Sequence, residues 1–417
     1  MEGQQAIAMT SSRVAEPLSP SEDHDFRAVS IVQDEAGLTV TWSNGASGRF
    51  LYFWLRENCP EDANSLTGQR LLNLGDIPDD IRPTHVGLAD GSVRLNWPDG
   101  RTSVHDPVWL YEQRYVEGAP RSAPLRIQAW DSSLDLAELR ASYDELMSDD
   151  EARYEAMERI VRYGLLRISG TPKIATENLA KRFGYLHDTN YGVTLDVRSE
   201  VKAWFRVLSK GAIPPHTDNA YRYTPTGITF FHCVEQIRAC GGQSYYVDGL
   251  KLAERIREID EDAFNVLCNV PLTFHRHIPE NTSTGIDAAY YKVEAPVFRL
   301  NVNSQVVGLR YHPRTVAPFV GSETEIRRVY RARKLLEDTS LDHSLRVQFQ
   351  ANVGECTVYD NQRVMHARTS FEEVMDGVRH FRQCHIDREE LHSRLRLLGM
   401  KLGRRVPEEQ ITPGASF

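Results

Sequence analysis

Several features that define particular protein classes are scarce in this sequence. Only six cysteines occur among 417 residues and none forms a CxxC pair, so a disulfide framework is not predicted and a reducing compartment is favoured. No apolar run reaches the length of a membrane-spanning helix, and the N-terminus lacks the apolar core of a signal peptide. The net charge of −9 argues against a general nucleic-acid binder. We therefore expect a soluble, cytoplasmic protein without membrane or nucleic-acid partners.

The N-terminal part of the chain is predicted to form a small β domain. Residues 1–26 are polar and predict a disordered tail. Residues 27–115 alternate apolar and polar side chains around turn signals such as Asp90-Gly91 and Asp99-Gly100, which is typical of antiparallel hairpins. Residues 116–131 contain two prolines and few large apolar residues before Leu125, and predict a linker.

Residues 132–400 are predicted to form a larger, mainly β domain with flanking helices. The stretches "SLDLAELRASYDELM" and "DEARYEAMERIVRYG" have helical spacing, and "TENLAKRFGYL" predicts a further helix with Thr176 as its N-cap. From about residue 200 to 387 many short strands predict a sandwich or a double-sheet barrel, interrupted by the helix "ETEIRRVYRARKLLEDTS". The helix "REELHSRLRLLGMKLG" then precedes a C-terminal tail, 401–417.

A possible metal site is indicated by "IPPHTD". Residues i and i+2 of a strand point to one face, so His216 and Asp218 could converge on a metal ion. Non-haem iron oxygenases use two histidines and one carboxylate on one face of the metal, and His366 in "VYDNQRVMHARTSF" is the candidate for the second histidine. The alternatives are an ordinary surface His-Asp pair and a structural histidine.

An arginine that follows His366 could bind the distal carboxylate of a keto acid. Arg379 in "GVRHFRQCHID" offers a guanidinium fork that matches a carboxylate in bidentate geometry. Alternate residues of a strand share a face, so only one of Arg379 and Arg382 can point toward the iron.

These motifs, together with "CGGQSYYVDG", resemble the 2-oxoglutarate-dependent dioxygenases of the taurine dioxygenase class. "TVTWSNGASGRFLYFWLRENCP" is similar to the small β domain of the γ-butyrobetaine hydroxylase and trimethyllysine hydroxylase branch. The resemblance implies a double-stranded β-helix, or jelly roll, with His216, Asp218 and His366 as iron ligands and Arg379 and Ser244 binding 2-oxoglutarate. It also implies Fe(II), 2-oxoglutarate and O₂ as cofactors, with ascorbate as a supporting reductant, and a homodimer. Hydroxylation of a C–H bond in a small molecule, with succinate and CO₂ as co-products, is the expected reaction.

The small domain departs from the pattern of that branch. Its relatives carry a zinc ion bound by three cysteines near "ENCP" and a later histidine. Here Cys59 remains, whereas Glu61, Asn64 and Arg101 occupy the other positions. Structural zinc sites need four Cys or His ligands, so we expect no structural zinc.

The substrate region departs as well. The γ-butyrobetaine enzymes hold a trimethylammonium group in an aromatic cage. The cage positions fall on Tyr191, Leu195, Leu208 and His385, and Asn219 replaces the tyrosine that follows HTD. Leu195 and Leu208 make this pocket more apolar, and we expect a substrate other than γ-butyrobetaine or trimethyllysine. Besides those five, the expected substrate contacts are Trp204, Phe205, Arg206, Tyr221, Asn301 and Asn303. Arg206 could pair with an anionic group or face solvent.

Three other functions fit parts of the pattern. A zinc or manganese hydrolase could use the same three ligands, and dependence on 2-oxoglutarate would separate it from an oxygenase. A non-catalytic jelly-roll binding protein would have no reason to keep Arg379. A γ-butyrobetaine hydroxylase with a rebuilt cation pocket would convert that betaine to carnitine.

Overall fold

The computed structural model describes residues 26–116, 127–198, 211–236, 242–280, 288–370 and 379–404. The chain divides into two compact units between residues 119 and 120, and each is described by itself. Within the described residues, no helix is both long and apolar enough to cross a membrane.

The N-terminal unit contains two three-stranded antiparallel sheets, in the orders β1-β2-β3 and β4-β5-β6. Their elements are β1 (Ala28–Gln33), β2 (Gly37–Trp42), β3 (Ser47–Leu51), α1 (Tyr52–Glu57), β4 (His85–Ala89), β5 (Ser92–Asn96), β6 (Thr102–His105) and α2 (Pro107–Gln113). The predicted turns at Asp90-Gly91 and Asp99-Gly100 join β4 to β5 and β5 to β6, and both glycines have positive φ. Side chains from both sheets, including Trp42 and Leu95, form one core.

The second unit is built on two antiparallel-rich sheets that together form the jelly-roll core. A four-stranded sheet has the order β10-β19-β12-β17, and a six-stranded sheet has the order β7-β8-β18-β11-β20-β9. The strands of these sheets are β7 (Arg140–Ser142), β8 (Leu165–Ser169), β9 (Thr194–Arg198), β10 (Ile213–His216), β11 (Ile228–Glu235), β12 (Ser244–Asp248), β17 (Arg346–Phe349), β18 (Cys356–Asp360), β19 (Val364–Arg368) and β20 (His380–Ile386). Two further hairpins are β13 (Leu272–Ile278) with β14 (Ala289–Ala295), and β15 (Phe298–Leu300) with β16 (Val306–Leu309).

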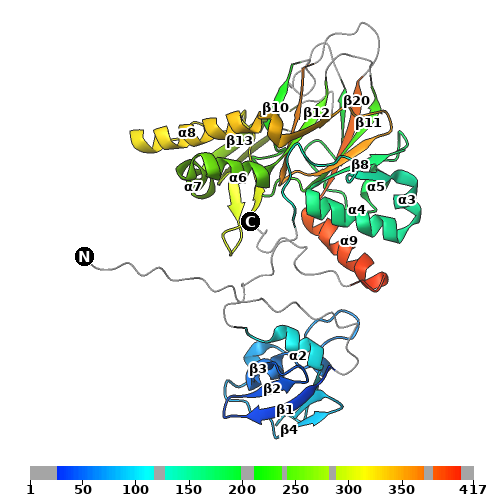
Figure 1. Ribbon diagram of the computed structural model, residues 1–417, viewed down its shortest axis with the longest axis vertical. Helices are drawn as coiled ribbons and strands as arrows, with labels where there is room; N and C mark the ends of the chain where they lie inside the picture. The colour runs from blue at the N-terminus through cyan, green and yellow to red at the C-terminus, as the bar shows by residue number, and fades with distance from the viewer. Residues whose placement is uncertain are drawn as a thin grey trace. The chain divides into compact units, whose positions relative to one another are not determined.

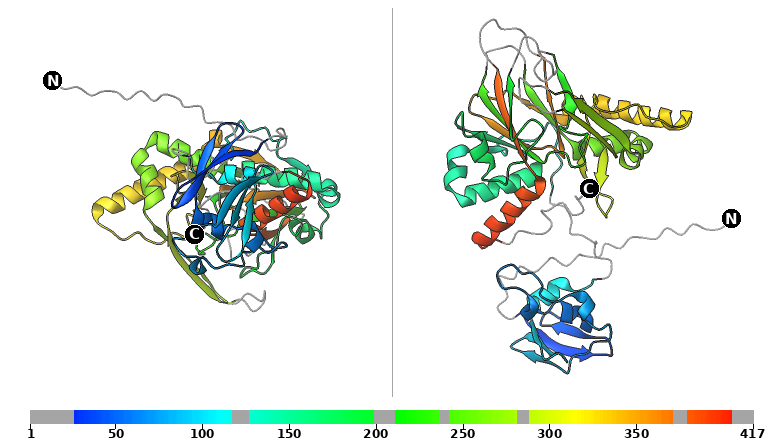
Figure 2. Two further views of the ribbon diagram at one scale, coloured as in Figure 1. Left: turned by 90° about the horizontal axis from the view of Figure 1, so that it is seen from below. Right: turned by 180° about the vertical axis from the view of Figure 1, so that it is seen from behind.

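Helices cover the core of this unit from two sides (Figures 1 and 2). They are α3 (Tyr143–Ser148), α4 (Asp150–Tyr163), α5 (Thr176–Ala180), α6 (Gly249–Ile259), α7 (Glu261–Asn269), α8 (Glu323–Ser340) and α9 (Arg388–Lys401). Helices α4, α5 and α9 pack against the outward side chains of the six-stranded sheet, such as Cys384 and Ile386. Because strand residues alternate, the next residues along β20, Gln383 and His385, face inward toward the other sheet. The helices therefore leave the inner face of the six-stranded sheet uncovered, between the two sheets.

Several secondary-structure predictions are confirmed and others are wrong. Helices α8 and α9 lie where predicted, and the helix predicted over "DEARYEAMERIVRYG" is α4, whose N-terminus is capped by Asp149. The predicted helix over 133–147 is wrong before Tyr143, because the Asp131 and Asp135 side chains accept bonds from nearby backbone N–H groups and close turns there. Thr176 is not an N-cap. Its hydroxyl instead bonds to His232 Nδ1 at 2.8 Å.

Helices α6 and α7 lie in a stretch that was expected to be mostly β. Each begins after an aspartate whose side chain accepts a bond from the first turn, Asp248 for α6 and Asp260 for α7. These N-caps and the helical spacing of the apolar residues were the local signals for both helices.

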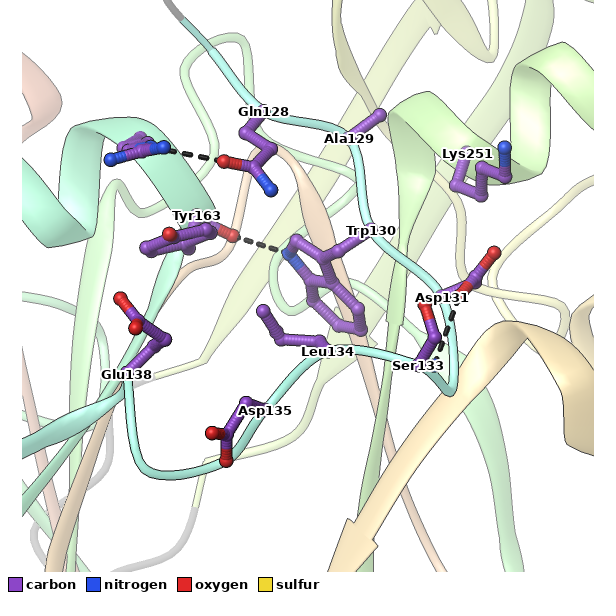
Figure 3. Close-up of a pocket in the computed structure, with 11 residues that line it drawn as sticks. Gln128, Ala129, Trp130, Asp131, Ser133, Leu134, Asp135, Glu138, Tyr163 and Lys251 are labelled. Carbon is purple, nitrogen blue, oxygen red and sulfur yellow. Dashed lines mark hydrogen bonds between the residues drawn. The ribbon is translucent and has the colours of Figure 1, made fainter.

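The second unit includes the end of the segment that was expected to be a linker. Trp130 is buried there, and its indole donates to the backbone oxygen of Tyr163 at 2.6 Å (Figure 3). A pocket of about 400 Å³ beside it is lined by acidic residues such as Asp135 and Glu138 and by Lys251, and contains none of the predicted metal ligands. Trp130 therefore anchors the chain where it enters this unit.

Candidate metal centre

His216, Asp218 and His366 come together at one end of the four-stranded sheet. His216 ends β10 and lies directly opposite His366 of β19 in the antiparallel register, with ring centroids 4.2 Å apart. Asp218 follows in the turn, and its Oδ1 lies 3.5 Å from His216 Nε2 and 3.6 Å from His366 Nε2. One ligand atom from each residue fits within 4.8 Å of the others, a spacing that suits a single metal ion. The three side chains come together only because β10 and β19, which are distant in the sequence, pair as neighbouring strands.

The protonation states of these groups suit metal binding. His216 Nδ1 lies 2.9 Å from the backbone oxygen of Pro214, so Nδ1 carries the proton and Nε2 is left as the ligand atom. Burial, followed by the neighbouring His216, lowers the pKa of His366 to about 3, so its imidazole is neutral. Burial raises the pKa of Asp218, but His366 and His216 outweigh it and hold that pKa well below the usual range. One imidazole nitrogen from each histidine and a carboxylate form a ligand set that fits Fe(II).

Residues behind Asp218 fix the orientation of its carboxylate. Gln383 Nε2 donates to Asp218 Oδ2 at 2.9 Å, which leaves Oδ1 on the side of the histidines. The side chain of Asn361 accepts from the backbone N–H of Asp218 at 2.7 Å and donates to its backbone oxygen at 3.0 Å. Gln383 and Asn361 were not identified from the sequence as supports of the metal ligands. No local pattern marks them.

A further histidine that the sequence did not indicate stands beside the cluster. The ring of His312 lies 4.7 Å from the ring of His216 in an edge-on arrangement. Two hydrogen bonds between the neighbouring residues Thr217 and Tyr311 hold it there. The backbone N–H of Thr217 donates to the backbone oxygen of Tyr311 at 2.7 Å, and the backbone N–H of Tyr311 donates to the Thr217 hydroxyl at 3.1 Å. Burial, followed by His216, lowers the pKa of His312 to about 3, so this ring is neutral as well.

The two residues expected to bind 2-oxoglutarate lie in a buried, basic part of the site. Ser244 is buried and lies opposite Arg368 in the pairing of β12 with β19. Arg379 is also buried, with its guanidinium 4.2 Å above the Phe381 ring. Burial and then the nearby charge of Arg368 lower the pKa of Arg379 to about 10. Two buried guanidinium groups close together favour an anion between them. Arg368 was not identified from the sequence.

Arg379 and Arg382 do face opposite sides of the sheet. Arg382 forms an ion pair with Asp196 at 2.9 Å and a longer one with Glu177 on the helix-covered side. Arg379 directly precedes β20, and its guanidinium lies over the ring of Phe381, which shares the inner face of β20 with Gln383.

Five of the expected substrate residues are linked to Asp218 through its chain neighbour Asn219 or through Gln383, which holds its carboxylate. Leu195 lies opposite Gln383 in the pairing of β9 with β20. His385 is buried, and its Nδ1 lies 3.0 Å from the Thr229 hydroxyl. The other three, Asn219, Tyr221 and Tyr191, form a polar chain in which the Tyr221 hydroxyl donates to Asn219 Oδ1 at 2.8 Å and is hydrogen-bonded to Tyr191.

Two of the remaining expected substrate residues lie in a turn and not on a strand. Asn301 and Asn303 were expected on a strand, but they lie in the turn between β15 and β16, where Asn301 Oδ1 accepts from the backbone of Asn303 and Gln305. An asparagine side chain commonly closes turns in this way, which explains the error. The others lie outside the described residues: Trp204, Phe205, Arg206 and Leu208.

Ion pairs occupy the part of the N-terminal unit where relatives were expected to bind zinc. Arg56 pairs with Asp62 and Asp99, and Arg101 lies 3.3 Å from Asp62. The buried Cys59 thiol contacts Glu61 Oε2 at 3.3 Å. Burial and this contact raise the pKa of Cys59 to about 12, so the thiol of the metal-free protein stays protonated.

A jelly roll that presents two histidines and one carboxylate in this way is the architecture of a non-haem iron oxygenase. Comparison with known families supports this class. The family described as "Taurine catabolism dioxygenase TauD, TfdA family" matches residues 128–385, and "Gamma-butyrobetaine hydroxylase-like, N-terminal" matches residues 29–111. The chain therefore belongs to the TauD/TfdA family and is a dioxygenase that depends on Fe(II) and 2-oxoglutarate.

Named relatives cover nearly the whole chain. Gamma-butyrobetaine dioxygenase of Pseudomonas sp. is 30% identical over 374 residues, which cover 87% of this chain and 94% of that protein. Trimethyllysine dioxygenase of Meyerozyma guilliermondii is 27% identical over 402 residues, which cover 90% and 97%. The solved structure of a taurine dioxygenase from Burkholderia xenovorans aligns with a TM-score of 0.42 at 15% identity, over 64% of this chain and 90% of that one.

Proposed function

We propose that His216, Asp218 and His366 hold Fe(II), and that the enzyme hydroxylates a C–H bond of a small molecule while 2-oxoglutarate is converted to succinate and CO₂. The observation that carries this proposal is the convergence of the three side chains, with ligand atoms within 4.8 Å of one another. When bound, the iron would supply the activation of O₂. The hydrolase and the non-catalytic binding protein are set aside because the chain belongs to a family of dioxygenases.

The chain's own residues would position the reactants around the metal. Arg379 and Ser244, with Arg368 nearby, would bind 2-oxoglutarate through its distal carboxylate. Gln383 would hold Asp218 with a single oxygen toward the metal, which leaves room for the co-substrates. Neutral His312 and His385 add polar groups without adding charge to the site. The substrate would lie on the side of Leu195, Tyr191 and Tyr221.

We propose a substrate other than γ-butyrobetaine. Among the expected cage positions that the structure describes, Leu195 and His385 replace aromatic residues. Burial lowers the pKa of His385 to about 4, so its imidazole is neutral. A leucine offers no π face to a quaternary ammonium group. The alternative, a rebuilt cation pocket, receives support from Tyr221 and Tyr291, whose rings stack with centroids 5.6 Å apart. Formation of carnitine from γ-butyrobetaine would establish that alternative.

The iron assignment is tested with purified full-length protein under nitrogen. We expect Fe(II) and 2-oxoglutarate to produce a visible charge-transfer band that is absent in His216→Ala and present in His277→Ala, a control at an exposed histidine of β13. A screen of small molecules, read by succinate release, then identifies the substrate. If His216→Ala kept full turnover after its iron was removed and restored, the assignment would be wrong.

We further propose that the N-terminal unit holds no zinc. We propose that the protein acts in the cytoplasm on a small molecule, without nucleic-acid or membrane partners. We also propose that it is a homodimer and that ascorbate supports its reaction. The ion pairs around Asp62 and the protonated Cys59 support the first of these proposals. Light scattering of the purified protein tests the dimer, and succinate release with and without ascorbate tests the reductant.

A further inference from the structure

Within the described part of the chain, two buried hydrogen-bond donors beside the proposed substrate region have no hydrogen-bond partner. They are Nε of Arg222 and Nδ2 of Asn190. Burying a donor without an acceptor costs free energy, and nearly all such groups in folded proteins are paired. Two of them in contacting side chains therefore call for an explanation beyond chance.

The contacts of Arg222 show which kind of hydrogen-bond partner would satisfy these two atoms. Its Nη2 donates to Asn190 Oδ1 at 2.7 Å and to the Tyr291 hydroxyl at 3.2 Å. The amide oxygen of Asn190 therefore faces Arg222, and its nitrogen is the end that remains unpaired. A guanidinium Nε and an amide nitrogen can only donate. The group that would satisfy both must be an acceptor.

The charge around Arg222 favours an anionic acceptor. Arginine is always protonated, and among the described residues Arg222 forms no ion pair with a carboxylate. Its guanidinium lies 4.6 Å from the centroid of the Tyr291 ring. Arg276 lies directly opposite Tyr291 in the pairing of β13 with β14, and its charge acts on Tyr221. Two arginines flanking this ring would repel a trimethylammonium group and attract a carboxylate.

The two donors lie on the substrate side of the metal cluster. Tyr291 stacks on Tyr221, whose hydroxyl is bonded to Asn219, the residue after Asp218. The charge of Arg222 also acts on His385, which lies 3.4 Å from Gln383, the residue that holds Asp218. A molecule bound at Arg222 would therefore extend toward the ligands of the metal.

We propose that Arg222 and Asn190 bind a carboxylate of the substrate and hold it at the end remote from the oxidised carbon. The inference rests on the proposed function, because it assigns the substrate of the same site. It makes the substrate an organic acid whose anionic group occupies the region where a trimethylammonium cage was expected. Arg222 and Asn190 would bind and position this substrate.

The test compares three probes that share one alkyl chain: hexanoate, hexanamide and hexyltrimethylammonium. Each is titrated by calorimetry into full-length protein that holds Fe(II) and saturating 2-oxoglutarate under nitrogen. We expect hexanoate to bind at least about tenfold more tightly than the other two probes, since a charge-assisted bidentate contact is stronger than a neutral one. Arg222→Gln should lose this preference and Arg222→Lys should keep part of it.

Two more variants complete the experiment. Asn190→Asp places a carboxylate against Arg222 and should abolish hexanoate binding, whereas Tyr223→Phe, at an exposed neighbour, should leave it unchanged. Tighter binding of the cationic probe, binding of no probe up to its solubility limit, or hexanoate binding that is unaffected by both Arg222→Gln and Asn190→Asp would overturn the inference. The charge-transfer band recorded in each sample reports the proposed function separately, because its absence from wild-type protein would contradict the iron and 2-oxoglutarate site itself.

Discussion

The side-chain amide of Gln383 donates a 2.9 Å hydrogen bond to Asp218 Oδ2, while Oδ1 of the same carboxylate faces both histidines of the cluster. This arrangement separates the two oxygens into one that is held by the protein and one that is available to a metal. Hydrogen bonds of this kind commonly set the affinity of a metal site.

Replacing Gln383 should weaken iron binding. Gln383→Leu removes the hydrogen bond that orients Asp218, so we expect the Kd for Fe(II) to rise roughly 10- to 100-fold. The measurement is anaerobic titration of metal-free protein. Gln348→Leu, on β17, is the matched control and should bind iron like the wild type. An unchanged Kd in Gln383→Leu would show that Asp218 is oriented by other groups.

The two arginines of "RHFRQCHID" should differ in their effect on 2-oxoglutarate. Arg379→Gln removes a buried guanidinium and should raise the Kd for 2-oxoglutarate roughly 10- to 100-fold, the value of a charged hydrogen bond. Arg382→Gln breaks a partly exposed ion pair with Asp196 on the opposite face and should have little effect. Intensity of the visible band against 2-oxoglutarate concentration gives both constants. Equal effects of the two variants would contradict the assignment of Arg379.

The N-terminal unit should hold no metal. Cys59 is protonated, and Arg56, Arg101 and Asp62 form ion pairs at the place where zinc was considered. His216→Ala protein, in which the iron site is disabled, should therefore contain no stoichiometric zinc when cells are grown with zinc and the protein is analysed by mass spectrometry for metals. Cys59→Ser in the same background should give the same result. Zinc at one equivalent that disappears in Cys59→Ser would show a site there.

The stability of the N-terminal unit should fall in mild acid because of His105. This side chain is buried, stacks on Trp109, and burial lowers its pKa from 6.5 to about 4. Below pH 6.5 this histidine binds a proton in the unfolded chain but stays neutral in the folded unit until about pH 4. The free energy of unfolding is therefore highest above pH 6.5 and decreases as the pH falls to about 4. The total loss is on the order of 3 kcal/mol.

Hydrogen exchange of the β5 backbone in the full chain measures this loss, after correction for the intrinsic effect of pH. His105→Phe keeps the aromatic contact and should remove most of the pH dependence between pH 6.5 and 4. His85→Phe, at an exposed histidine, should not. If the two variants behaved alike, the pH dependence would have another origin.

Much of the fold was predictable because local patterns report local structure. Asp-Gly turns marked the hairpins of the N-terminal unit, and helical spacing marked α8 and α9. The prediction failed where side chains closed turns. Asp131 and Asp135 shortened the helix expected over 133–147, and Asn301 ended a strand. Such bonds compete with helix and strand over a few residues, so periodicity does not reveal them.

The sequence by itself determined the class of the protein, since the residue types and order of His216, Asp218, His366 and Arg379 resemble one family of dioxygenases, which the family match confirms. Only the tertiary structure decided which residues support that site. Gln383, Asn361, Arg368 and His312 reach it through antiparallel pairing and turns that join distant segments. The unpaired donors of Arg222 and Asn190 likewise exist only in the folded chain. A hydrogen bond depends on distance and direction in space, and separation along the chain specifies neither.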